Sequence, residues 1–188
     1  MNRTDSKDVV EVLLDQHTQI KGLFRELSEA QGGRKEDLFD DLVRLLAVHE
    51  TAEEIVVHPT ARQKIDNGDD VVEARLHEES EAKQALAELH DLGVDHRDFD
   101  TKLAELARDV TGHANREEQE EFAQLRAKLP EDRLRQMAGA VRVAEAIAPT
   151  RPHPAAGESA VANILAGPPI AVFDRVRDAV RDWTRSNS

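Results

Sequence analysis

Apolar residues recur at intervals of three and four along most of this 188-residue chain, and short breaks divide the pattern into four long segments. This spacing places apolar side chains on one face of an α-helix, whereas a half-buried strand would need strict alternation. The breaks contain residue types that end helices, at 32–33, 67–68, 93 and 130. Because the connections are short, consecutive helices should run antiparallel. The pattern therefore predicts an all-α fold: an antiparallel up-down-up-down four-helix bundle with a C-terminal helical extension.

We expect the bundle over residues 1–130 and the extension over residues 131–188. The extension should contain a helix at about Glu131 to Ile147, the Pro-rich connector APTRPHPAAGES and a terminal amphipathic helix. The polar face of that terminal helix mixes Asp and Arg, so a membrane-surface role is not expected. Docking onto the bundle, or onto a second copy in a homodimer, is favoured instead.

Charge and residue content exclude several classes of function. With 38 acidic against 25 basic side chains the net charge is -13, which argues against binding nucleic acid or anionic membranes. The absence of cysteine excludes disulfides, thiolate metal sites and cysteine nucleophiles, and the absence of tyrosine excludes a phenolate ligand. No export signal or bilayer-spanning run of about 20 residues is found. We expect a cytoplasmic protein whose partners are metals, small molecules or proteins.

The stretch LLAVHETAEEIVVHP, residues 45–59, places polar groups among the apolar residues of the second predicted helix. At about 100° per residue, Glu53 lies about 40° from His49, so these two side chains share a face. His58 lies about 180° from His49 and is expected to point elsewhere. It also precedes Pro59, which disfavours a helical conformation at His58 and predicts a bend or local break.

Each predicted bundle helix carries one histidine within its apolar stripe: His17, His49, His77 and His113. In the motifs HETAE, HEESE and HANREE a glutamate follows four residues later: Glu53, Glu81 and Glu117. Residues four apart project side by side, so several helices can bring imidazoles and carboxylates to one interior point. Buried carboxylates are costly unless a cation compensates them. Imidazole and carboxylate donors without thiolate suit iron or manganese better than zinc.

A single histidine on an apolar face is more often an ordinary core residue than a ligand. Four on successive helices, with three matching glutamates, favour a metal site. Neighbouring glutamates offset by about 100° are expected to be solvated or to contact the ligands from outside: Glu50, Glu54, Glu78 and Glu118. Glu120 and Glu121 are expected on the solvated face and His90 on the surface, whereas His96 and His153 are expected to be structural or exposed.

Two other metal motifs do not fit. HETAE and HEESE lack the second histidine of the metalloprotease motif H-E-x-x-H. Ferritin-like bundles use Glu-x-x-His, and no histidine here has a glutamate three residues before it.

The order His, His-x3-Glu, His, His-x3-Glu, with HETAEEIVVHP matching H-x3-EE-x4-P, resembles the hemerythrin-like family of HHE cation-binding domains over about residues 8–129. The resemblance implies an antiparallel four-helix bundle around two iron ions joined by an oxo or hydroxo bridge. It implies Glu53 and Glu117 as bridging carboxylates and four terminal imidazole ligands: His17, His49, His77 and His113. The tail segments APTRPHP, NILAGPP and DRVRDAV resemble extensions of some bacterial members.

The chain departs from the oxygen-carrying members of that family. They have His-x3-His on the third helix and His-x4-Asp on the fourth, where this chain has His77-x3-Glu81 and His113-x3-Glu117. Reversible oxygen carriage is therefore not the expected role. Glu81 is open as a further ligand, a hydrogen-bond acceptor beside the ligands or a partly exposed spacer. As a third carboxylate ligand it would lower the charge of an oxo-bridged diferric unit from about +2 to about +1 and favour the ferric state.

Three functions follow as hypotheses. The leading one is a di-iron protein that binds O2, peroxide or NO for sensing, storage or stress protection. The second is a di-iron enzyme that consumes peroxide or NO with the same residues. The third is a helical interaction module in which the buried polar groups only specify packing.

Overall fold

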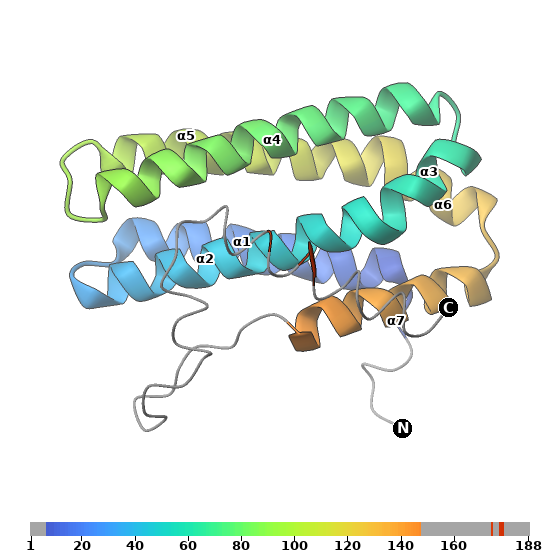
Figure 1. The fold of residues 1–188 in the computed structure, drawn as a ribbon, viewed down its shortest axis with the longest axis horizontal. Coiled ribbons are helices and arrows are strands. Elements are labelled where there is room, and N and C mark those ends of the chain that lie inside the picture. Colours follow the sequence, from blue (N-terminus) through green and yellow to red (C-terminus); the bar gives the residue numbers. More distant parts are fainter. Residues whose placement is uncertain (1–6, 148–173, 175–176, 179–188) are drawn as a thin grey trace.

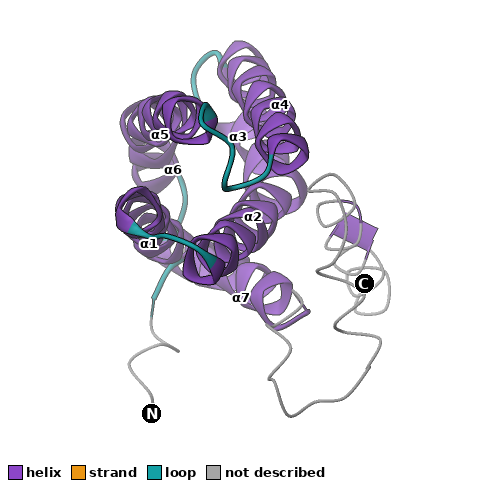
Figure 2. Cartoon of the chain, turned by 90° about the vertical axis from the view of Figure 1, so that its left-hand side faces the viewer, coloured by secondary structure: helices purple, strands orange, loops and turns teal. Residues whose placement is uncertain are grey.

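The four long helices form two antiparallel pairs in the computed structural model, which describes residues 7–147, 174 and 177–178. The pairs are α1 (Val9–Glu29) with α2 (Gly33–Ala52), and α4 (Gly68–Leu92) with α5 (Phe99–Arg116). The α1–α2 and α4–α5 loops lie at one end of the molecule and the α3–α4 connection at the other (Figure 1). Figure 2 shows the four helices end-on around a common interior. The predicted antiparallel four-helix bundle is confirmed, and the described residues contain no strand.

Two of the long helices contain a widened π-helical turn. η2 (Glu53–Val57) joins α2 to α3 (His58–Lys64), and η3 (Glu117–Phe122) joins α5 to α6 (Ala123–Lys128). A π-turn pairs each N–H with the carbonyl five residues earlier, so it adds one residue to a helical turn. Side chains beyond such a turn are therefore rotated away from the positions that an unbroken α-helix would give them.

Pro59 gives a physical reason for the first π-turn. Proline has no N–H, and in a regular α-helix its ring clashes with the carbonyl four residues earlier, here that of Ile55. The wider turn relieves that contact, and the N–H of His58 donates to the carbonyl of Glu53. The break predicted near Pro59 is thus present, but it precedes the proline and the chain continues as α3.

The start of α1 is fixed by a capping box. The Asp8 carboxylate accepts the Glu11 N–H at 2.8 Å, and the Glu11 carboxylate accepts the Asp8 N–H at 3.0 Å. Two N–H groups that the first helical turn cannot satisfy are thereby paired.

The turn before α4 requires glycine. Asn67 adopts a left-handed conformation with φ 52°, and a Cβ on Gly68 would lie 2.5 Å from the carbonyl oxygen of Ala61. This close approach joins α3 tightly to α4.

Large apolar side chains fill the core above and below the middle of the bundle. The largest that are fully buried are Leu13, Leu27, Leu42, Leu46, Leu86, Leu89, Phe99, Leu106, Phe122 and Leu125. Each contributes about 1.5–3 kcal/mol on burial, and together they offset the cost of the polar groups described below. Within the described part of the chain, no helix has the length and apolar character needed to cross a bilayer.

The helix predicted at Glu131 to Ile147 is present as α7 and packs against α1 and α2 (Figure 2). Its buried residues are Leu134, Met137, Ala138 and Val141. The predicted terminal helix lies mostly outside the described residues. Arg177, which is described, pairs through Nη2 with Glu54 Oε2 at 2.9 Å. The division into residues 1–130 and 131–188 stays a prediction.

Candidate metal centre

Imidazoles and carboxylates form one buried cluster in the middle of the bundle. Every member is at most 9% exposed: His17, His49, Glu50, Glu53, His58, Glu79, His113, Glu117 and Glu121. They come from α1, α2, η2, α3, α4, α5 and η3, so each long helix contributes to the cluster. Burial of this many ionisable groups needs a compensating charge.

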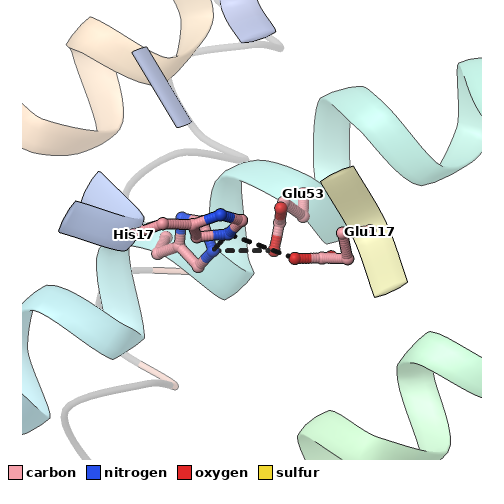
Figure 3. A group of neighbouring side chains, drawn as sticks. His17, Glu53 and Glu117 are labelled. Atoms are coloured by element: carbon pink, nitrogen blue, oxygen red, sulfur yellow. Dashed lines mark hydrogen bonds and ion pairs between the residues drawn. The ribbon is translucent and has the colours of Figure 1, made fainter. Parts of the chain in front are cut away.

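Two overlapping sets of donor atoms can each surround one metal ion. Within each set the donor atoms lie within 4.8 Å of one another. We call the first set position 1, which comprises His17, His49, Glu53 and Glu117. We call the second set position 2, which comprises Glu53, Glu79, His113 and Glu117. Glu53 and Glu117 belong to both positions and lie side by side, facing His17 (Figure 3). Carboxylates shared in this way are placed to bridge two ions.

Hydrogen bonds to side chains outside the cluster orient three of its four imidazoles. The Nδ1–H groups donate to side-chain oxygens in the pairs His17–Glu118 (2.9 Å), His49–Gln16 (2.8 Å) and His113–Glu78 (2.8 Å). A proton on Nδ1 leaves a lone pair on Nε2, which is the atom that faces the cluster. This arrangement of outer acceptors is typical of metal-binding histidines.

The Nε2 atoms of His17 and His49 lie 3.1 Å apart. When both rings are neutral with the proton on Nδ1, two lone pairs face each other across this distance, and a cation bound between them removes the repulsion. Two nitrogens bound at right angles to one metal, each at about 2.1 Å, would be separated by about 3.0 Å. The observed spacing therefore fits ligands of one ion.

The shared carboxylates have no hydrogen-bond donors. All four oxygens of Glu53 and Glu117 are buried and accept no hydrogen bond. The nearest imidazole nitrogens lie 3.3 Å from Glu117, on His17 and His113, and 3.4 Å from Glu53, on His49. Unpaired buried carboxylates are among the costliest groups in a protein, so these oxygens and the neighbouring lone pairs fit a bound cation pair.

Burial and close contacts shift the pKa values within the cluster far from their ordinary values. Burial, reinforced by Glu117, raises the pKa of Glu53 well above its ordinary value. Burial opposes ionisation of Glu117 too, but His113 and His17 outweigh it and hold its pKa well below the ordinary range. Burial and His17 lower the pKa of His49 well below its usual value. Cations in the cluster would take over the role of the protons, so metal binding should release protons.

His58 is buried in the cluster, contrary to the sequence-based expectation that it points elsewhere. The π-turn adds one residue, so His58 follows His49 by the equivalent of eight helical positions, a rotation of about 80° rather than about 180°. Its Nε2 donates to Glu79 at 2.8 Å and its Nδ1 to Glu121 at 3.1 Å. Burial opposes its charged form, but these two carboxylates outweigh burial and raise its pKa to about 10.

Glu121 is fully buried, so its expected position in solvent was wrong. It lies four residues after Glu117, and that spacing was an available signal for a shared face. Glu50 is also buried, 3.2 Å from the Lys83 ammonium, and burial together with Glu79 raises its pKa to about 8.

His77 and Glu81 do not join the cluster, and their placement on the core face of the third helix was wrong. Their side chains are 74% and 67% exposed and face each other at 3.5 Å. The buried face of α4 is instead Val72, Arg75, Glu79, Ala82, Leu86 and Leu89. His77 lies about 200° from Glu79 on the helix, so the third helix contributes a carboxylate in place of the expected imidazole.

A cavity of about 200 Å³ opens onto the cluster. The imidazoles of His17, His49 and His113 line one part of it, and apolar side chains line another: Ile20, Leu46, Ala82, Ala85, Leu106 and Val110. Exposed charged residues, including Glu81 and Arg116, also border it. The cavity is several times larger than the roughly 30 Å³ that one water occupies, so small molecules have room beside both positions.

Three known proteins resemble this chain in fold or sequence. A hemerythrin HHE cation binding domain protein from Mycobacterium kansasii has a similar solved structure, with a TM-score of 0.62 and 21% sequence identity over 72% of this chain and 83% of that one. An uncharacterized hemerythrin-like protein of Schizosaccharomyces pombe is 29% identical over 139 residues, 73% of this chain and 68% of that protein. A DNA nickase of Nostoc is 27% identical over 145 residues, 76% of this chain but 41% of the nickase.

The model of the hemerythrin HHE cation binding domain matches residues 8–125. The match covers the four bundle helices and every member of the buried cluster. The chain therefore belongs to the hemerythrin HHE cation-binding family, as its motifs predicted.

Proposed function

We propose that the chain is a dinuclear iron protein that binds O2, peroxide or NO for sensing, storage or stress protection. The observation that carries the proposal is the pair of shared carboxylates, Glu53 and Glu117, whose four oxygens are buried without a hydrogen-bond donor. Family membership supports cation binding, and the donor set of imidazoles and carboxylates suits iron.

The residues divide into ligands and supports. His17 and His49 would hold one ion, His113 and Glu79 the other, and the two shared carboxylates would bridge them. A bound iron pair would supply a redox-active centre and a position for a small ligand. The outer hydrogen bonds keep each Nε2 directed inward without rearrangement, which is the pre-organisation that a metal site needs.

Glu79 gives the third helix a carboxylate donor, the role considered for Glu81. A third carboxylate lowers the residual charge of the centre and favours the ferric state. This charge supports oxidant handling or sensing in preference to reversible oxygen carriage. The effect of the third carboxylate on the reduction potential is tested by Glu79→His, which should raise that potential. Glu81→His should leave the potential unchanged.

A di-iron enzyme that consumes peroxide or NO is the second candidate. The cavity beside His17, His49 and His113 favours it, since 200 Å³ exceeds what a diatomic ligand fills. We do not extend the nickase activity of the Nostoc relative to this chain, because the match spans 41% of that protein and a net charge of -13 opposes DNA binding.

The test is metal analysis of the chain after anaerobic loading with Fe²⁺, followed by exposure to air. Two irons per chain and a near-ultraviolet charge-transfer absorption are expected. A chain that stays free of iron would overturn the proposal, and the helical interaction module would then be the remaining hypothesis. Turnover of peroxide or NO well above that of free iron would favour the enzyme over the sensor.

A further inference from the structure

We propose that position 2 accepts manganese, so that the chain assembles a mixed manganese–iron pair, with iron at position 1, when both metals are present. This inference rests on the dinuclear centre proposed above. It concerns which ion each position selects, and the two positions differ in chemistry.

The donor atoms differ between the positions once the shared carboxylates are set aside. Position 1 adds two imidazoles, those of His17 and His49, whereas position 2 adds the imidazole of His113 and the carboxylate of Glu79. Imidazole suits iron, zinc and copper, while carboxylate oxygen suits manganese and magnesium. Iron binds more tightly than manganese at most sites of this kind, but its advantage shrinks as nitrogen donors are replaced by oxygen.

His58 keeps position 2 rich in oxygen. Its two ring nitrogens face the carboxylates of Glu79 and Glu121, at 2.8 and 3.1 Å, so both nitrogens donate and neither has a lone pair for a metal. The bond to Glu79 uses Oε1 and leaves Oε2, which is buried and accepts no hydrogen bond, as the ligand atom. His58 is therefore a positioning residue that fixes the direction of the Glu79 carboxylate.

The experiment compares three loadings of the metal-stripped full chain, all without oxygen: Fe²⁺ alone, Mn²⁺ alone, and a mixture in which an excess of Mn²⁺ offsets the reduced advantage of iron at position 2. Metals per chain are counted by mass spectrometry, and electron paramagnetic resonance reports whether manganese and iron are coupled. We expect two irons from Fe²⁺ alone, and about one manganese and one iron from the mixture. Two irons per chain from the mixture would refute manganese selection and leave the di-iron proposal standing. Failure of Fe²⁺ alone to bind would refute the dinuclear centre and this inference with it.

Matched variants locate the selectivity. Glu79→His makes the donors of the two positions alike, so the manganese taken from the mixture should fall about tenfold or more. Glu81→His introduces the same side chain two residues further on, on the exposed face, and should leave it unchanged. Glu79→Asp keeps an oxygen donor and should retain manganese, which separates donor chemistry from any effect on folding. Undiminished manganese in folded Glu79→His would refute the assignment.

His58→Gln tests the positioning role. A glutamine carries both its N–H donors on one nitrogen, so it cannot reach two carboxylates from two separate ring atoms as the imidazole does. Loss of such a supporting contact typically weakens metal binding about 10–100-fold. We expect that loss for one of the two ions, with the other retained. Equal loss of both ions, or of neither, would contradict the role.

Discussion

Replacing Glu53 by glutamine should stabilise the metal-free protein and abolish the dinuclear centre. Glu53 is fully buried, and neither carboxylate oxygen accepts a hydrogen bond. Burial, reinforced by Glu117, raises its pKa well above 4.5, so the fold disfavours the ionised carboxylate that the unfolded chain carries at pH 7. At about 1.36 kcal/mol per pKa unit, the resulting loss of stability at pH 7 is at most about 3.4 kcal/mol, which is reached when the buried group is fully protonated there.

Glutamine removes that cost but buries an amide group that finds only some of its partners. We therefore expect a net gain of about 1–3 kcal/mol in the free energy of unfolding, or about 3–10 °C in Tm for a chain of this size. The bridging oxygen is lost at the same time, so fewer than two metals should bind. A residue whose replacement stabilises the fold while removing a ligand is typical of a site maintained for function.

Urea unfolding followed by circular dichroism, with a chelator at pH 7, measures the first effect, and metal counts measure the second. Glu81→Gln is the matched control because its side chain is 67% exposed, and it should change the stability by no more than about 0.5 kcal/mol. A metal-free Glu53→Gln protein that is less stable than the parent, or one that still binds two metals, would refute the reasoning.

Three further outcomes follow from the structure. The native metal-free protein holds a proton on His58 up to about pH 10 and on Glu50 up to about pH 8, whereas the unfolded chain releases these protons near pH 6.5 and 4.5. The free energy of unfolding should therefore fall as the pH rises from 7 to 9.5, by an amount on the order of 3 kcal/mol. Equal urea midpoints at pH 7 and pH 9.5 would contradict this. His77→Ala should leave the number of metals per chain unchanged because the side chain is 74% exposed, and the loss of an ion would return His77 to the ligand set. Gly68→Ala should lower the free energy of unfolding by about 2 kcal/mol or more, because its Cβ would lie 2.5 Å from the Ala61 carbonyl oxygen, and an unchanged thermal midpoint would show that the turn can relax.

Wherever the helices are regular, the periodicity of the sequence was sufficient to predict which side chains face the interior. The pairs His49–Glu53 and His113–Glu117 span four residues of helix before each π-turn begins, so the assumption of 100° per residue holds and both pairs face the interior. His17 lies in an unbroken helix and was placed correctly for the same reason. The structure therefore brings five of the seven expected site residues together: His17, His49, Glu53, His113 and Glu117.

The third helix was misread because its face was chosen from a histidine instead of from the apolar residues around it. Val72, Leu86 and Leu89 are spaced to place Glu79 on the buried face, and a count of apolar residues alone would have found it. His77 drew the assignment to the opposite face because the expected motif called for His at that helix. Hydrophobic periodicity defines the buried face of this helix more strongly than the position of a single histidine does.

The contacts of His58 could not be found from regular geometry, and the two π-turns show why. Each of the shared carboxylates, Glu53 and Glu117, is the first residue of a π-helix. In such a turn the residue five positions later comes into line with the first. After Glu53 that residue is His58, which holds Glu79.

After Glu117 the corresponding residue is Phe122, whose ring stacks on His17 with centroids 5.7 Å apart and an interplanar angle of 17°. A straight α-helix at either place would keep the histidine four residues before the carboxylate but would rotate the supporting residue away from the cluster. Each widened turn therefore lets one continuous run of helix place three side chains at the cluster: an imidazole, a shared carboxylate and a side chain that supports a ligand on another helix. In the proposed centre, four helices would in this way supply the ligands of two cations, and the same helices would hold those ligands in place from behind.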